Sequence, residues 1–392
     1  MSTYQIKAVE TKKDIIDFYQ LPFKIYKEDV NWIPQVRQEV EGVFLKKKNK
    51  YFTHGICERW ILKNDKNETL GRIAAFINEK KAYTFKQPTG GIGFFECIND
   101  YEVASSLFDH AKNWLSSKGM EAMDGPINFG ENNKFWGLLI ENFNFPTYYG
   151  QNYNPPYYKN LFEKYGFKVY YYQLINYRQI NDPLPEKYKQ KAEAIINDTS
   201  FSIKKIEIKK IEKYAEDFRS VYNAAWVTHD NFKEMSMELA ISIFKKMKPI
   251  IDEDLICFVY HNNKPVAFCL GIPDINPIFK RLDGNLNLFG KFKFMALKLF
   301  IKISRANGVA IGVHPEFQKK GIEGAIFTDL AKRLQGNSKY TDMVVTWVGD
   351  FNPKMQYIFE DIGFVVKSKM ATYRKIFDEN VPFERCPIID KT

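Results

Sequence analysis

The feature of this sequence that most constrains its fold is one short unit that occurs in both halves of the chain. Leu161–Phe167 reads LFEKYGF and Ile358–Phe364 reads IFEDIGF. Each copy continues through a stretch of β-branched and aromatic residues to a Tyr-Arg pair, at Tyr177–Arg178 and at Tyr373–Arg374. A glycine that follows a helical segment is typical of a helix C-terminus, because glycine adopts the left-handed backbone conformation without steric cost. Each unit is therefore predicted to be a helix, a glycine cap and a strand.

Other segments also match between the two halves. Strands are expected at Leu70–Asn78 and Lys264–Gly271, because each is an apolar run that follows a polar turn. The remaining pairs are two strands, two helices and two further strands: Gly91–Ile98 with Gly308–Val313, Glu102–Lys118 with Gly324–Leu334, and Glu121–Ile127 with Met343–Val348. We therefore expect an α/β protein in which each half is a mixed β-sheet flanked by helices.

Length and turn residues indicate where the halves meet. A chain of 392 residues exceeds the size at which one core usually keeps growing. Two prolines interrupt the pattern at Asn181–Pro185. We therefore predict an N-terminal domain at residues 1–182 and a C-terminal domain at residues 183–392.

Cysteine usage and the N-terminal sequence indicate a cytoplasmic protein. The five cysteines are scattered and never form a Cys-x-x-Cys pair, which favours reduced thiols. Residues 1–20 are charged throughout and resemble no secretion signal, and no apolar run reaches the length of a membrane span.

One segment of the second half has the pattern of an anion site. Gly312–Ala325 reads GVHPEFQKKGIEGA, a strand that leads through a glycine-containing turn into a helix. The free N–H groups and the positive dipole end of a helix N-terminus attract phosphate groups. We predict ligand contacts from Val313, Gln318, Lys319, Lys320, Gly321, Ile322 and Gly324. A glycine-rich turn without a ligand is the alternative interpretation.

This segment resembles motif A of the GNAT (GCN5-related N-acetyltransferase) superfamily, because it contains V-x-P-E-x-Q-x-x-G. The resemblance implies that Gln318 and Gly321 belong to a loop for the pyrophosphate of coenzyme A, with acetyl-CoA or another acyl-CoA as the cofactor. Glu323 stands where the superfamily has a second glycine or alanine, and Asn352 matches its asparagine near the pantetheine arm. Cys97–Ala104, in the first half, lacks the motif and is expected to hold no cofactor.

The whole chain resembles a group of bacterial proteins that contain two tandem GNAT-like repeats. The resemblance rests on Gly125–Asn128, Asn154–Tyr158 and Pro273–Asn276. It implies the GNAT fold in both halves, each of them degenerate to a different degree.

The acceptor site is expected where the strand at Lys264–Gly271 ends. Asp274 and Asn276 are our candidate catalytic residues, with Asp274 as the base or amine-binding carboxylate, whereas a turn-capping aspartate is the alternative. His229–Asn231 is a second candidate lining of the same pocket. His314, which precedes a proline at a strand end, is expected to be structural.

The usual acid of GNAT enzymes is missing at both equivalent positions of this sequence. The resemblance places a helical tyrosine five residues before the Phe of the Gly-Phe pair, where this chain has Phe162 and Phe359. Tyr357 lies on another face of the same helix and is expected to be a packing residue.

The basic character of the chain points to an anionic partner without choosing one. The net charge is +10, but most lysines alternate with glutamates as on solvated helices, so nucleic acid is not favoured. A helix at 288–305 is expected to place Lys291, Lys298, Lys302 and Arg305 on one face. We favour a solvated surface helix there over a helix on anionic lipid or along an acceptor channel. The five histidines lie too far apart in sequence to suggest a metal site.

These observations favour an acyl-CoA-dependent N-acyltransferase that acts on a small-molecule or peptide amine. Two alternatives stay open: a non-catalytic ligand-binding protein of the GNAT fold, and a peptidyl transferase of the tandem-GNAT type that uses aminoacyl-tRNA.

Overall fold

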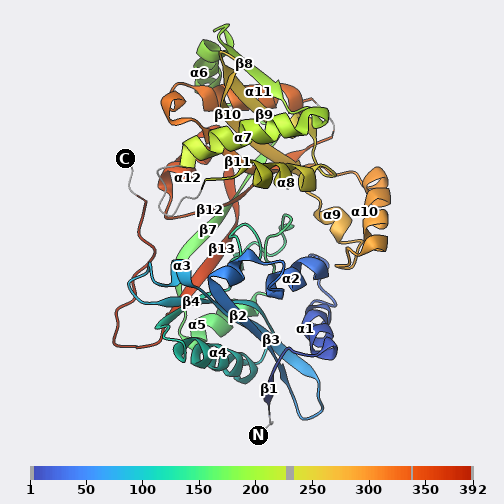
Figure 1. Ribbon diagram of the computed structural model, residues 1–392, viewed down its shortest axis with the longest axis vertical. Helices are drawn as coiled ribbons and strands as arrows, with labels where there is room; N and C mark the ends of the chain where they lie inside the picture. The colour runs from blue at the N-terminus through green and yellow to red at the C-terminus, as the bar shows by residue number, and fades with distance from the viewer. Residues whose placement is uncertain (1–3, 227–233, 337–338, 390–392) are drawn as a thin grey trace.

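The computed structural model describes residues 4–226, 234–336 and 339–389. Thirteen strands form one mixed β-sheet that runs through the whole molecule, in the order β1-β2-β3-β4-β5-β13-β7-β12-β11-β10-β9-β8, with β6 beside β13. Figure 1 shows the molecule as elongated, with the first half of the chain at one end and the second half at the other.

The first half comprises the elements β1 to β7. In chain order these are β1 (Gln5–Ala8), α1 (Lys12–Ile25), α2 (Arg37–Phe44), the 3-10 turn η1 (Lys50–Thr53), β2 (Gly55–Lys63), β3 (Thr69–Asn78), α3 (Glu79–Ala82), β4 (Thr89–Cys97), α4 (Tyr101–Ser116), β5 (Ala122–Gly125), β6 (Leu138–Glu141), α5 (Tyr157–Tyr165) and β7 (Lys168–Gln179).

The second half repeats much of this order. Its elements are α6 (Glu186–Ile196), β8 (Phe201–Lys205), η2 (Ile208–Lys210), α7 (Ile211–Trp226), α8 (Met237–Met247), η3 (Glu253–Leu255), β9 (Ile256–His261), β10 (Lys264–Pro273), α9 (Asn276–Phe279), α10 (Leu288–Phe300), β11 (Arg305–Val313), η4 (Pro315–Phe317), α11 (Ile322–Leu334), β12 (Asp342–Gly349), α12 (Pro353–Ile362) and β13 (Val365–Ile376).

The repeated unit has the predicted local structure in both copies. Helix α5 ends at Gly166 with φ 97°, and α12 ends at Gly363 with φ 93°, both in the left-handed region that favours glycine. Each glycine leads directly into the long strands β7 and β13, which contain the two Tyr-Arg pairs. The predicted sequence of helix, glycine cap and strand is confirmed.

The two halves exchange their last strands. Strand β13, from the second half, pairs with β5 of the first half through Tyr373 opposite Gly125. Strand β7, from the first half, pairs with β12 of the second half through Tyr177 opposite Val344. The two exchanged strands also pair with each other, antiparallel, along most of their length. The sheet therefore crosses the predicted division at 182/183, which remains our proposal for where one repeat ends and the next begins.

Alternation along the strands places helices on both faces of the sheet. In β2, Trp60 and Leu62 pack in the core under α4 and α5, whereas Ile61 points into the opposite core with residues of α1 and α2. In β9, Cys257 packs toward α6 and α11, whereas Phe258 packs toward α7 and α8. Each half is thus a sheet covered by helices on both faces, as Figure 1 shows.

The helix expected at 288–305 is shorter than predicted. Helix α10 stops at Phe300, because Ile301 already has the extended ψ of 117°. Arg305 belongs to β11 and forms an ion pair with Asp342, with 3.1 Å between Nε and Oδ1. The prediction that Lys302 and Arg305 share a helix face with Lys291 and Lys298 was therefore wrong.

Candidate functional site

An opening between two parallel strands lies in the second half. The ladder between β11 and β12 ends at the pairing of Gly308 with Val345, although β11 continues to Val313 and β12 to Gly349. We call the segments 309–313 and 346–349, which do not pair with each other, the strand opening; the Thr346 hydroxyl donates to the Val309 carbonyl at 3.4 Å where it begins. Backbone groups of diverging strands can pair with an extended ligand that carries amide groups, as in β-strand addition.

The equivalent place in the first half is closed by its own chain. There β4 and β5 pair from Thr89 to Gly91, and the Ile127 N–H then donates to the Ile92 carbonyl at 2.7 Å. A Cβ atom on Gly93 would lie 1.9 Å from the carbonyl oxygen of Ile127. The chain after β5 thus lies directly against β4, which leaves no equivalent opening.

The N-termini of the helices that follow β4 and β11 also differ between the two halves. Helix α4 is capped by Asp100, whose carboxylate accepts from the N–H groups of Glu102 and Val103. Helix α11 begins after Gly321 and has no side-chain cap. An anion at α4 would be repelled by Asp100, whereas no side chain caps the first N–H groups of α11, although Glu323 lies in its first turn.

The predicted cofactor turn lies between η4 and α11. Gln318, Lys319 and Lys320 are exposed, and Gln318 Nε2 donates to the Val313 carbonyl at 3.3 Å. Lys319 has φ 64° and Gly321 has φ 90°, a backbone shape in which successive N–H groups can converge on an anion. The two lysines add positive charge at the same place.

Three other residues of the predicted set can reach a ligand only through their backbone. Val313 and Ile322 are buried in the core beneath α11. Gly324 faces helix α6, where a Cβ would lie 2.9 Å from the Tyr188 carbonyl, and a Cβ on Gly321 would lie 2.6 Å from the Lys191 carbonyl. Both glycines therefore also permit the close packing of α6 on α11.

Asn352 lies at the start of α12, where its side-chain oxygen accepts from the Met355 N–H at 3.2 Å. It caps the helix that follows β12 and so stands just beyond the end of the strand opening. The predicted cofactor residues thus lie in two places: the turn and helix start that follow β11, and the helix start that follows β12.

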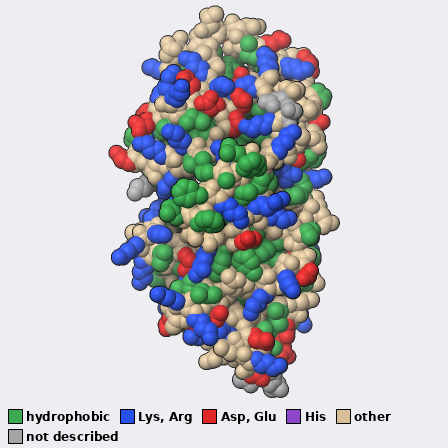
Figure 2. All heavy atoms as spheres, turned by 90° about the vertical axis from the view of Figure 1, so that its right-hand side faces the viewer, with side chains coloured by type: hydrophobic (Ala, Val, Ile, Leu, Met, Phe, Trp, Pro, Cys, Tyr) green, Lys and Arg blue, Asp and Glu red, His purple; other side chains and the backbone are tan. Residues whose placement is uncertain are grey.

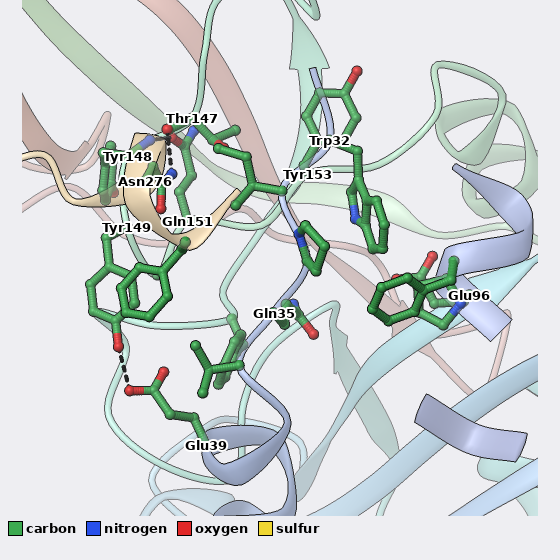
Figure 3. A pocket seen from close by; sticks show the side chains of 18 of the residues that line it. Trp32, Gln35, Glu39, Glu96, Thr147, Tyr148, Tyr149, Gln151, Tyr153 and Asn276 are labelled. Carbon is green, nitrogen blue, oxygen red and sulfur yellow. Dashed lines mark hydrogen bonds between the residues drawn. The ribbon is translucent and has the colours of Figure 1, made fainter. Parts of the chain in front are cut away.

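A cavity lies where the two halves meet, and we call it the junction cavity. It measures about 50 Å³. Most of its lining comes from the first half, including Arg72, Glu96 and Tyr149, whereas Asn276 and Phe279 come from the second. Figure 3 shows Asn276 beside Thr147 on one side of the cavity and Glu96 near Trp32 on the other. One water needs roughly 10–15 Å³ of such space, so the cavity suits a small polar head group and not a long chain.

A buried carboxylate, that of Glu96, lines this cavity. Glu96 is 7% exposed and accepts hydrogen bonds from Tyr26 at 2.7 Å and from Tyr158 at 2.8 Å, while Arg72 Nη2 lies 3.4 Å from its other oxygen. Burial raises the pKa of Glu96, although Arg72 and the two hydroxyls oppose that shift. Arg72 Nε has no partner among the described residues.

Of the predicted catalytic pair, Asn276 lines the cavity on its second-half side, and Asp274 lies next to it outside the lining. The side chain of Asn276 donates to the Thr147 carbonyl at 2.6 Å. Asp274 is 4% exposed, and its carboxylate accepts from the Asn276 N–H at 3.2 Å, so it holds the turn that positions Asn276. Burial raises the pKa of Asp274 to about 6. Sequence reasoning placed the pair near an acceptor pocket, and their catalytic role stays a prediction.

The aromatic residues at the expected acid positions are buried in the core. Phe162 and Phe359 are 0% and 6% exposed. Tyr357 is 64% exposed, so the prediction that it packs in the core was wrong, because its position on α12 faces solvent. His314 accepts from the Glu316 N–H at the start of η4, which is a structural role. His229–Asn231, the second candidate lining, lies outside the described residues.

Among the residues that the structure describes, no group of three or more histidine, cysteine, aspartate or glutamate side chains could hold a metal ion. Among the helices of residues 4–226, 234–336 and 339–389, none has the length and apolar character needed to cross a bilayer.

Sequence reasoning missed Glu96, Arg72 and Tyr26. A signal was present, because Arg72 and Glu96 each interrupt an otherwise apolar strand. Charged residues in buried strands are almost always paired, so two such interruptions predict a shared ion pair. That pair forms between neighbouring strands, with Arg72 opposite Glu96 in the β3–β4 ladder.

The sheet contains two parallel strand pairs, β4 with β5 and β11 with β12, and a helix connects the strands of each pair. This arrangement defines a GNAT-type fold that occurs twice in one chain. This fold is that of the GNAT N-acetyltransferases, as predicted. A tandem GNAT protein from the clavulanic acid biosynthesis pathway superposes with TM-score 0.54 and 9% identity, over 97% of this chain and 100% of that one. A GCN5-related glucosamine N-acetyltransferase region of a fungal multi-domain GH3 β-N-acetylglucosaminidase gives TM-score 0.53 and 11% identity, over 96% of this chain and 38% of that one.

Two curated proteins are similar along nearly their whole length. Protein YghO of Escherichia coli (strain K12) is 26% identical over 389 residues, which cover 96% of each chain. Bacterial ceramide synthase of Caulobacter vibrioides is 23% identical over 376 residues, which cover 94% of this chain and 96% of that protein. No family model matches the sequence.

Proposed function

We propose that this protein is an acyl-CoA-dependent N-acyltransferase. The second half would hold the acyl-CoA in the strand opening, and the junction cavity would hold the amine of the acceptor. The observation that carries this proposal is the cavity itself, which is lined by both the buried carboxylate of Glu96 and the amide of Asn276.

The donor site would be single and in the second half. Its residues are those predicted from the sequence: Val313, Gln318, Lys319, Lys320, Gly321, Ile322, Gly324 and Asn352. The support for this assignment is the difference between the halves, since the strand opening exists only beside β11 among the described elements, and α11 lacks the carboxylate cap of α4. A bound acyl-CoA would supply an activated acyl carbon.

Glu96 is the base that we assign to this reaction. An amine is mostly an ammonium ion near neutral pH and must lose a proton before it can attack a carbonyl carbon. A raised pKa suits Glu96 for that proton, and the unpartnered Arg72 Nε can bind a hydroxyl or carbonyl oxygen next to it. The new C–N bond would form as the thioester C–S bond breaks, with coenzyme A leaving as the thiol.

The acceptor that fits best is a long-chain amino alcohol. The cavity has room only for a polar head group, and its apolar lining by Phe279, Ile33 and Val36 continues into the core next to α10. The relative from Caulobacter vibrioides is named a bacterial ceramide synthase, and ceramide is the N-acyl product of such an amine. We propose the same class of acceptor for this chain.

Turnover measured with matched amines tests this function. The purified protein would receive acetyl-CoA, octanoyl-CoA or palmitoyl-CoA with sphinganine, and the free thiol and the amide product would be measured by a thiol reagent and by mass spectrometry. We expect thiol release that requires sphinganine and a product mass equal to the N-acyl amine. N-acetylsphinganine, in which the amine is blocked, should give none.

A non-catalytic role is the second candidate, and one observation favours it: phenylalanines are buried at both expected acid positions. Binding of acyl-CoA by calorimetry, without thiol release from any donor and amine pair, would support that role against ours. Retention of charged tRNA on filters, without coenzyme A binding, would instead support the peptidyl transferase.

A further inference from the structure

Helix α10 presents an apolar face to solvent. Six of its side chains are between 51% and 84% exposed: Leu288, Phe289, Phe292, Met295, Leu299 and Phe300. Figure 1 shows α10 at the edge of the molecule, away from the sheet. Figure 2, which faces that edge, shows hydrophobic side chains gathered at mid-height with lysine and arginine side chains around them. We call these six side chains the α10 surface. Monomeric soluble proteins rarely expose contiguous apolar patches of this kind unless they bind something there.

The opposite face of α10 is fixed to the protein. Phe294 is 8% exposed and packs on Phe279 of α9, with 5.8 Å between ring centroids, and Leu297 joins the same cluster. Asn287 caps the helix N-terminus by accepting from the Gly290 N–H. The helix is thus a rigid part of the fold, and its exposed apolar face is not the result of a detached segment.

The chain segment that forms α10 carries charge of one sign. No aspartate or glutamate occurs between Asp283 and Glu316 in the sequence. The exposed lysines of this stretch are Lys291, Lys293, Lys298 and Lys302. Lys298 also donates to the Pro249 carbonyl at 2.5 Å, which ties it to the end of α8. Apolar side chains surrounded by cations complement a surface with anionic head groups and an apolar interior.

We infer that α10 docks this protein flat on an anionic phospholipid bilayer, with the α10 surface among the acyl chains and the lysines at the head groups. A helix of 13 residues is too short to cross the hydrocarbon core, which takes about 20 residues, so it lies in the interface. A second copy of this chain is a poorer occupant, because a two-fold contact through α10 would bring the lysines of both copies together.

Docking through α10 would bring the junction cavity close to the lipid. Phe279 contacts Phe294 of α10 and also lines the cavity, where it stacks on Tyr149 with 5.0 Å between ring centroids. One aromatic layer thus separates the docked helix from the cavity. This part of the inference rests on the proposed function: an acceptor whose chain stays in the bilayer could place its amine in the cavity. The docking itself does not depend on turnover.

Vesicle flotation of the whole purified protein tests the docking. The probes are vesicles of phosphatidylcholine alone and vesicles with phosphatidylglycerol as about one third of the lipid. We expect the protein to float with the anionic vesicles and to bind the neutral ones far more weakly, with the difference shrinking as salt is raised. The test variant replaces four exposed residues by serine: Phe289→Ser, Phe292→Ser, Leu299→Ser and Phe300→Ser. It should lose at least tenfold in vesicle partitioning.

Matched variants control for the loss of apolar and of positive side chains. The apolar control changes three side chains that are 62–67% exposed elsewhere on the molecule: Tyr83→Ser, Tyr357→Ser and Ile388→Ser. The charge variant is Lys291→Gln, Lys293→Gln and Lys302→Gln, and its control is Lys46→Gln, Lys47→Gln and Lys48→Gln, which are also exposed lysines. We expect the α10 charge variant to lose most of its preference for anionic vesicles and both controls to bind like the unchanged protein.

Three results would overturn the docking. The first is no flotation of the unchanged protein with anionic vesicles, and the second is equal flotation of the serine variant and its control, with circular dichroism showing that both are folded. The third is light scattering that finds a dimer which the serine variant abolishes, without vesicle binding, since α10 would then join two copies. Turnover of sphinganine added in detergent reports on the proposed function separately, so either idea can fail alone.

Discussion

Arg374 of β13 forms a buried two-pronged ion pair with Asp124 of β5, although the two residues are 250 positions apart. The distances are 2.6 Å from Nε to Oδ1 and 2.8 Å from Nη2 to Oδ2. Both residues are nearly inaccessible to solvent, at 5% and 6% exposed. They lie opposite each other in the β13–β5 ladder, where the last strand of the chain joins the sheet of the first half.

Removing one member of this pair should destabilise the whole fold. Arg374→Met keeps most of the side-chain volume but leaves Asp124 buried without its partner, and it also removes the stacking of the guanidinium on Tyr170, 3.6 Å from the ring centroid. Breaking a buried pair typically costs about 3–5 kcal/mol. Urea denaturation should show that loss in the free energy of unfolding.

A solvent-exposed pair that also joins distant parts of the chain provides the control. Lys86 and Glu384 form it, with 2.9 Å between Nζ and Oε1, but their side chains are 64% and 66% exposed. Lys86→Met should cost less than about 1 kcal/mol. Equal losses for the two variants would mean that burial of the Arg374–Asp124 pair does not matter.

Glu96→Gln should abolish most of the turnover and leave cofactor binding intact. An amide cannot take the proton of the ammonium, and loss of a general base typically costs about 10²–10⁴-fold in rate. Acyl-CoA affinity measured by calorimetry should stay unchanged, because the proposed donor site is in the other half. Glu39→Gln is the matched control in the same cavity, since Glu39 accepts from Tyr149 and pairs with Lys134 at the partly exposed rim. If Glu39→Gln loses as much activity as Glu96→Gln, our assignment of the base is wrong.

The raised pKa of Asp274 predicts a pH-dependent stability. Its folded-state pKa of about 6 lies above the ordinary value of 3.8, so the folded protein binds the proton more tightly than the unfolded chain does. Stability of the unchanged protein is therefore lost as pH rises from about 4 to about 6. Asp274→Asn cannot titrate, so its free energy of unfolding relative to the unchanged protein should increase by about 2 kcal/mol between pH 4 and pH 7. A difference that is constant with pH would show that the carboxyl titrates normally.

The same variant also tests whether Asp274 acts at the acceptor site or at the acyl-CoA site. Asp274 accepts a hydrogen bond from the N–H of Asn276, whose side chain lines the cavity. Asp274→Asn should lower turnover and change coenzyme A affinity by no more than about twofold, or about 0.4 kcal/mol. A large loss of affinity in calorimetry would move Asp274 to the donor site.

Glu323→Gly should strengthen coenzyme A binding severalfold. Glu323 lies in the first turn of α11, next to the N–H groups that we assign to the pyrophosphate, so its carboxylate would compete with the ligand. Glycine costs the helix up to about 1 kcal/mol in stability, which denaturation should register separately. Glu323→Gln removes the charge and keeps the shape, so it separates repulsion from obstruction. Calorimetry should find one site per chain, and two sites would contradict the closed opening of the first half.

Short-range sequence signals predicted most of the local structure. Gly166 and Gly363 end their helices in the left-handed conformation because no other residue adopts it as easily, and the strands that follow are rich in β-branched and aromatic residues. The turn around Gln318 was found because its glycine and its strand-to-helix setting are local features. These preferences act over a few residues, so the sequence alone is enough to show them.

Only the tertiary structure decided how the halves join and where the reactive carboxylate lies. A strand next to its own repeat and a strand exchanged with the other repeat have the same local pattern, so pairing of β13 with β5 depends on contacts such as Arg374 with Asp124. Glu96 becomes a candidate base only when Tyr26, Tyr158 and Arg72 surround it, because burial and those partners set its pKa. The sequence determined the elements and their order, and packing between distant residues determined the site.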